Sequence, residues 1–167
     1  NAVVVTRRNS AIYDLIDLEG RQVACVNQYS MSGYRVPVAY LRSVGITAAP
    51  LFSSGDDHTD VVRAVMLGEV GAAFTHDGFA TNLPKEEVAT LRVLTIPVAI
   101  PGAVWIVRED IAKDESLRTR ILRAAMNLAN ADDDPYWSVL SPVDSEAVTE
   151  YLTFYEMLRS YGREENR

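Results

Sequence analysis

Two serines and a glycine lie in one short turn, residues 29–34 (YSMSGY), between an apolar segment and a segment with helical spacing. Ser30 or Ser32 can cap the start of that helix, which leaves the other hydroxyl free. Such hydroxyls, together with the N–H groups of Gly33 and Tyr34 at the positive end of the helix dipole, can bind an anion. The simpler alternative is that one serine caps the helix and the other is only solvated.

Two further polar turns follow apolar segments. His58 comes after a small, glycine-containing approach at residues 53–57 and starts a segment with helical spacing. Asp77 lies in Thr-His-Asp-Gly, directly after residues 71–75. A histidine at a helix start is more often a surface residue, and Asp77 can equally be an N-cap. Because a carboxylate repels an anion unless the ligand supplies a proton or an ammonium group, Asp77 is also a candidate for selectivity.

A catalytic or metal-binding interpretation of the same residues is weak. Ser32, His58 and Asp77 have the residue types of a nucleophile, a base and an acid. The stretch SMSGY differs from G-x-S-x-G, however, and α/β-hydrolases place the acid before the histidine. His58, His76 and Asp77 lack the spacing of known metal motifs. We therefore predict no enzymatic activity, no catalytic residue, no metal and no cofactor.

An alternation of strand and helix patterns positions these turns. Short β-branched or apolar segments at residues 2–6, 22–27, 48–52, 71–75, 91–96 and 103–107 predict strands. Helical spacing occurs at residues 36–44, 60–67, 114–129 and 145–161. The alternation predicts an α/β fold of three layers, with helices on both faces of a mostly parallel sheet of about five strands. In such a sheet ligands bind beyond the carboxyl ends of the strands, where all three turns fall.

The composition excludes several other classes of protein. The chain has 167 residues and a net charge of −7, which argues against nucleic acid as a partner because phosphate binding needs a basic face. No segment approaches the roughly 20 apolar residues that span a bilayer. The single cysteine, Cys25, excludes an internal disulfide, and its apolar neighbours predict a core residue. The chain begins at Asn1 and not at Met, which we interpret as processing or truncation.

Three stretches together resemble the periplasmic solute-binding proteins of phosphate, phosphite and phosphonate ABC transporters, and related input domains of some sensor kinases. They are VVVTRRNSAIYDLIDLEGRQVACVNQYSMSGYRVP, HTDVVRAVMLGEVGAAF and RVLTIPVAIPGAVWIVRED. The family typically has a Ser-Thr-Ser-Gly-aromatic turn and a histidine at a helix start. Met31 replaces the usual Thr, one additional residue precedes His58, Gly71 replaces an Asp, and Ala103 replaces an acid that phosphonate binders often have.

The resemblance, which extends to about Asp110, implies one lobe of a type II periplasmic-binding-protein-like fold with extra C-terminal helices. Residues 1–110 would form the ligand-binding α/β lobe, and residues 111–167 would be helices that normally pack on a first lobe, which this chain lacks. The implied function is a periplasmic or extracytoplasmic solute-binding component that recognises a small oxyanion, such as phosphate, phosphite or a phosphonate, for an ABC transporter. A sensor-kinase input domain for another small anion is the alternative.

The resemblance also implies the ligand-binding residues and the partners. The serines and the backbone N–H groups of the turn would hold the anionic oxygens, His58 would add a donor, and Asp77 would meet a donor of the ligand. The partners would be the small oxyanion and an ABC permease or sensor kinase, and the apolar faces of the C-terminal helices are compatible with a homodimer. The implied ligand-binding residues are Ser30, Met31, Ser32, Gly33, Tyr34, His58 and Asp77.

Overall fold

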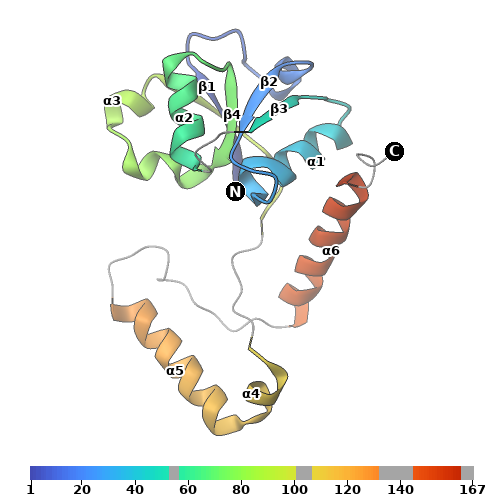
Figure 1. The fold of residues 1–167 in the computed structure, drawn as a ribbon, viewed down its shortest axis with the longest axis vertical. Coiled ribbons are helices and arrows are strands. Elements are labelled where there is room, and N and C mark those ends of the chain that lie inside the picture. The colour runs from blue at the N-terminus through green and yellow to red at the C-terminus, as the bar shows by residue number, and fades with distance from the viewer. Residues whose placement is uncertain (53–56, 101–106, 132–144, 163–167) are drawn as a thin grey trace. The chain divides into compact units, whose positions relative to one another are not determined.

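The computed structural model describes residues 1–52, 57–100, 107–131 and 145–162 (Figure 1). The chain divides into two compact units, Asn1–Ile100 with Thr153–Arg167, and Pro101–Leu152. The first unit contains the sheet and all three turns considered above. Within the described parts of the chain, no helix has the length and apolar character needed to cross a membrane.

A five-stranded sheet forms the centre of the first unit, in the order β3-β2-β4-β1-β5. Its strands are β1 (Ala2–Arg7), β2 (Gln22–Cys25), β3 (Ala49–Phe52), β4 (Ala72–His76) and β5 (Leu91–Thr95). β2 pairs in parallel with β3 and β4, whereas β1 pairs antiparallel with β4 and β5. The sheet is therefore mixed: β1 runs against the other four strands, which share one direction as predicted. β1 is buried on both faces like a parallel strand, so its composition does not reveal its direction.

Helices cover both faces of this sheet, which confirms the three-layer prediction. α1 (Val36–Ser43) and α2 (His58–Leu67) lie on opposite sides of it in Figure 1. Alternate residues of the same strands point to the two sides, because successive side chains of a strand face opposite ways. The core on the α1 side includes Ala2, Val4, Val23, Cys25, Ala72 and Phe74, and that on the α2 side includes Val3, Val5, Ala24 and Ala73.

Short helical turns connect the main elements of the first unit. They are η1 (Leu15–Leu18), η2 (Met31–Arg35), η3 (Asp77–Asn82) and α3 (Lys85–Val88). η2 is one π-helical turn that continues directly into α1, since the residues at the junction keep helical backbone angles. The predicted strand at residues 103–107 falls almost wholly outside the described residues, and so do Ala103 and the approach at residues 53–56.

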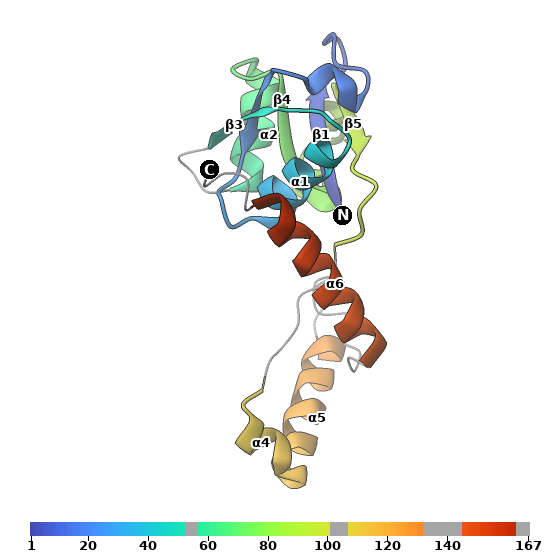
Figure 2. The same cartoon turned by 90° about the vertical axis from the view of Figure 1, so that its right-hand side faces the viewer.

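The C-terminal helices are close to their predicted ranges. α4 (Glu109–Lys113) precedes α5 (Glu115–Ala131), and the carboxylate of Asp114 between them accepts a hydrogen bond from the N–H of Leu117 at 2.9 Å. α6 (Ser145–Gly162) is the helix drawn in red in Figure 2. Its last ten residues, from Thr153 to Gly162, belong to the first unit. These residues pack on the α1 side of the core through Phe154, Met157 and Leu158. Tyr155, one residue after Phe154, is 42% exposed.

The turn after β2 is built on a close approach of two backbone segments. The N–H of Val26 donates to the carbonyl of Gly33 at 3.3 Å. A Cβ atom at position 33 would lie 2.6 Å from Cγ2 of Val26 and 2.8 Å from Oγ of Ser30. Only glycine fits this position without displacing the end of β2 or the start of the helix.

We predict that Gly33→Ala destabilises the fold, because the new methyl group overpacks a contact with the core. Overpacking of this kind costs about 1–3 kcal/mol, and urea unfolding followed by circular dichroism measures it. Gly71→Ala is the matched control, since its Cβ would meet its nearest neighbour at an ordinary 3.5 Å. Equal stability of Gly33→Ala and wild type would show that the turn is not held in this way.

The thiol of Cys25 supplies a second test of the core. Cys25 is fully buried, and burial raises its pKa from 9.0 to about 12. At pH 8 we therefore expect almost no thiolate, which is the form that attacks disulfide reagents. The thiol should react with a chromogenic disulfide only after urea unfolds the protein. Rapid reaction of the native protein would contradict the position of β2 in the core.

Candidate functional site

Three neighbouring strands of the sheet, β3, β2 and β4, end at the same edge because they are mutually parallel. The serine turn follows β2, His58 follows β3, and Asp77 follows β4. The topology thus brings the three predicted turns together, although they lie far apart in the sequence. This confirms that they share the carboxyl edge of the sheet, where α/β folds bind ligands.

Ser30, and not Ser32, caps the helix after β2. Its Oγ accepts a hydrogen bond from the N–H of Gly33 at 3.0 Å. The N–H of Gly33, expected to contact the ligand, is therefore occupied by this cap. The hydroxyl of Ser30 can still donate its proton to another acceptor, because a serine that accepts through its oxygen keeps its own O–H. Ser32 is half-buried, and its hydroxyl makes no hydrogen bond to the rest of the described chain.

The other residues of the serine turn hold it in place. Met31 packs against the core on the α1 side, and the ring of Tyr34 meets the ring of Phe52 at the end of β3 edge-on, with centroids 4.9 Å apart. Oδ1 of Asn27 accepts from the N–H groups of Tyr29 and Ser30 at 2.8 and 2.9 Å. Asn27 was missed by the sequence analysis, although an asparagine just before a turn is a recognised turn signal.

His58 is the first residue of α2, as predicted, and Asp57 caps that helix through a hydrogen bond from the N–H of Thr59 at 3.0 Å. Nδ1 of His58 lies 2.9 Å from Oγ1 of Thr75, a fully buried residue of β4. Partial burial and the nearby His76 lower the pKa of His58, while the charge of Asp57 acts in the opposite direction.

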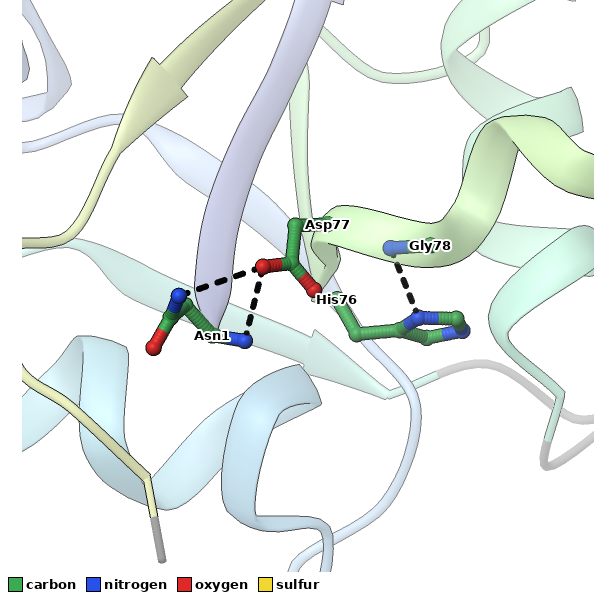
Figure 3. A network of polar contacts seen from close by, with 4 residues as sticks. All are labelled: Asn1, His76, Asp77 and Gly78. Atoms are coloured by element: carbon green, nitrogen blue, oxygen red, sulfur yellow. Dashed lines mark hydrogen bonds and ion pairs between the residues drawn. The ribbon is translucent and has the colours of Figure 1, made fainter. Parts of the chain in front are cut away.

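Asp77 and His76 make separate contacts after β4 (Figure 3). Oδ2 of Asp77 accepts from the α-amino group of Asn1 at 3.0 Å and from its Nδ2 at 3.2 Å. The hydrogen bond from the α-amino group is the main cause of a lowered pKa at Asp77. Nδ1 of His76 accepts from the N–H of Gly78 at 3.1 Å, so His76 is the N-cap of η3. The alternative that Asp77 is that cap is wrong, because the helical turn begins one residue earlier than expected.

The partners of these residues do not form a catalytic triad. His58 pairs with Thr75, and Asp77 pairs with Asn1, so neither the hydroxyl of Ser32 nor the carboxylate of Asp77 is bonded to the histidine. Within the described ranges, no group of three metal-ligating side chains is found. What the edge of the sheet offers is a set of hydrogen-bond donors near a helix start, which suits the binding of an anion.

Comparison with known proteins identifies the family. Residues 1–150 match the family described as "ABC transporter, phosphonate, periplasmic substrate-binding protein". Two solved structures of the protein XAC2383 from Xanthomonas citri, one bound to chloride ion and one to ATP, superpose with a TM-score of 0.76 and 18% identity. They cover 98% and 97% of this chain. The periplasmic aliphatic sulphonate binding protein SsuA from Escherichia coli superposes with a TM-score of 0.66 and 17% identity over 95% of the chain.

The chain spans 66% of the length of the XAC2383 structures and 63% of that of SsuA. At these identities the structural matches establish the fold, and no curated protein gives a match. The family match covers most of the chain and agrees with the fold, with the shared strand edge and with the resemblance noted in the sequence. This chain belongs to the periplasmic substrate-binding proteins of the phosphonate ABC transporter family.

Proposed function

We propose that this chain supplies one ligand-binding lobe of an extracytoplasmic protein that captures a small oxyanion, phosphate, phosphite or a phosphonate, and delivers it to an ABC permease without chemical change. The observation that carries the proposal is the meeting of the serine turn, His58 and the end of β4 at one edge of the sheet. In this proposal residues 1–110 form the lobe, and residues 111–167 are helices that pack on a further lobe of the complete protein, except the end of α6, which packs on this lobe through Phe154, Met157 and Leu158.

The donors for the anion come from the serine turn and from α2. The hydroxyl of Ser30 keeps its proton while it caps the helix, and the hydroxyl of Ser32 has no partner among the described residues. The positive end of the helix that continues into α1 faces the same place. The net charge of −7 does not prevent anion binding at this place, because the hydrogen bonds and the helix dipole act within a few ångströms, whereas salt screens the more distant charges.

Asp77 gives the proposed site a preference among anions. Its side chain is exposed, and an exposed carboxyl group is ionised at neutral pH. A carboxylate next to an oxyanion is tolerated when the ligand carries a proton between them. Hydrogenphosphate and the phosphite monoanion carry such a proton, whereas sulfate near neutral pH does not. We therefore assign Asp77 to selectivity and the hydroxyls of Ser30 and Ser32, with His58, to holding the anion. Met31, Gly33 and Tyr34 shape the turn.

The partner beyond the ligand is proposed to be the permease of an ABC transporter, as in the family. The alternative is an input domain of a sensor kinase, which would use the same lobe. A kinase domain in the complete protein would favour that alternative over transport. A homodimer through the C-terminal helices stays a prediction; Leu122, Met126 and Leu152 are among their exposed apolar side chains.

We predict that Ser32→Ala weakens anion binding, because it removes a hydrogen bond to a charged ligand. Such bonds contribute about 1.5–3 kcal/mol, which isothermal titration of the complete protein with phosphate and methylphosphonate would measure. Ser43→Ala is the control, since the hydroxyl of Ser43 lies at the other end of α1 and donates to the carbonyl of Tyr40 at 2.7 Å. If Ser32→Ala binds both anions as tightly as wild type, the serine turn is not the anion site.

We also predict that Asp77→Asn narrows the difference in affinity between phosphate and sulfate. The wild type should prefer phosphate, because the ionised carboxylate repels sulfate, which has no proton to place between the two. The uncharged amide can donate to sulfate and removes that repulsion. Glu86→Gln, on the exposed α3, controls for the loss of one negative charge. A wild type that prefers sulfate, or an Asp77→Asn variant with unchanged selectivity, would refute the role given to Asp77.

A further inference from the structure

The two histidines of the chain meet at the proposed anion site. His58 comes from the start of α2 and His76 from the end of β4. Their rings meet edge-to-face, with centroids 4.7 Å apart and an interplanar angle of 82°. Two imidazolium ions at this separation would repel each other strongly in a partly buried place. The pair therefore accepts one proton much more readily than two.

His76 is held in its neutral form by the backbone. Its Nδ1 accepts the hydrogen bond from the N–H of Gly78 at 3.1 Å that caps η3 (Figure 3). An imidazolium has a proton on both nitrogens and accepts no hydrogen bond. Protonation of His76 would thus break the cap. The neutral ring carries its proton on Nε2.

His58 has a partner that tolerates both of its protonation states. Nδ1 of His58 lies 2.9 Å from Oγ1 of Thr75. A hydroxyl can donate to a neutral Nδ1, and after a rotation it can accept from a protonated one. Thr75 is fully buried in β4, so its oxygen is fixed and holds the ring in one orientation. The hydrogen bond on Nδ1 leaves Nε2 as the nitrogen that can reach a ligand.

The charges around the pair do not select His58; the different hydrogen bonds at the two Nδ1 atoms do. Burial lowers the pKa of both rings, which keeps both neutral near pH 7 in the free protein. A charge on His76 lowers the pKa of His58 further, by more than Asp57 at the start of α2 raises it, whereas Asp77 raises the pKa of His76. Asp77 also accepts a hydrogen bond from Nδ2 of Asn1. On the η2 side, Arg35 donates to the carbonyl of Gln28 and lies over the ring of Tyr29.

We propose that Thr75 and His76 are positioning residues that make His58 the proton acceptor of the site, so that anion binding is coupled to the uptake of one proton by His58. The proposal rests on the proposed function, because it requires that an anion binds at this edge. A bound anion favours the imidazolium form and converts the donor on Nε2 into a charge-assisted one. His76 supplies a neutral neighbour, and Thr75 keeps the hydrogen bond to Nδ1 throughout.

The coupling gives a defined dependence on pH. The anion binds the protonated His58 more tightly, so affinity is highest below the pKa of His58 in the free protein, which partial burial lowers from its ordinary value. Above that pKa affinity falls by up to about tenfold per pH unit, as for any single-proton linkage. It becomes constant again above the pKa that His58 has in the complex.

The free protein gives the first test, which needs no ligand. Nitrogen-15 spectra of the imidazole rings, recorded between pH 4.5 and 8, distinguish the two neutral tautomers from the imidazolium. We expect His76 in the Nε2–H form at neutral pH and His58 as the first ring to take up a proton on acidification. The proposal is overturned if His76 carries its proton on Nδ1, or if it titrates at a higher pH than His58.

Binding gives the second test. Methylphosphonate is titrated into the complete protein at several pH values, in two buffers of different ionisation enthalpy, to count the protons taken up. The ligand's own ionisation cancels in the difference between wild type and His58→Gln. We expect wild type to take up about one proton more than His58→Gln just above the free pKa of His58, and His76→Gln to keep this uptake. Equal uptake by wild type and His58→Gln would overturn the coupling and leave the anion site intact.

The role of Thr75 is tested with a conservative pair of variants. Thr75→Val keeps the shape of the side chain and removes the hydroxyl, so both affinity and the pH profile of binding should change. Thr75→Ser should restore them. A wild-type pH profile in Thr75→Val would refute the positioning role. If wild type binds neither phosphate, phosphite nor methylphosphonate between pH 5 and 8, the proposed function fails, and the ring spectra still report separately on the order of protonation.

Discussion

The parallel pairing of β2 with β3 and β4 is the constraint on which the site depends. It places Val23 opposite Ala72 and Ala24 opposite Ala73, so small and β-branched side chains fill both faces of the central strands. With these strands parallel, the chain must leave each of them at the same edge. An antiparallel β2 would send the serine turn to the other end of the sheet, and none of its side chains would reach the end of β4.

The positions of the polar groups at that edge are fixed largely by the backbone. Gly33 lies against Val26 without room for a side chain, Ser30 caps the helix, and Asn27 binds two N–H groups of the turn. A π-helical turn at this place fits the general observation that such turns mark functional sites. A turn restrained in so many ways loses little further entropy when a ligand binds, which favours affinity.

Electrostatics at the edge is local and not a property of the whole chain. The protein is acidic overall. Within a few ångströms of the proposed anion site, however, the electrostatic potential is set by the Ser30 cap, the start of the helix and the two imidazole rings. Thr75 has a particular place in this arrangement, because it is a buried polar residue whose hydroxyl is paired with an ionisable ring. A buried hydroxyl needs such a partner, so the stability of β4 and the orientation of His58 depend on the same hydrogen bond.

The sequence alone determined the elements and the three polar turns, because hydrophobic period and turn residues are local signals. It placed β2, α1, α2 and β4 within a few residues, and it identified Ser30, Ser32, His58 and Asp77 at their ends. Tertiary structure decided what no local signal contains: the reversed direction of β1, the packing of α6 through Phe154 and Met157, and the contact between His58 and His76. It also decided that Ser30 caps the helix and that His76, not Asp77, caps η3. These outcomes depend on distances between segments remote in the chain, which arise only when the sheet assembles.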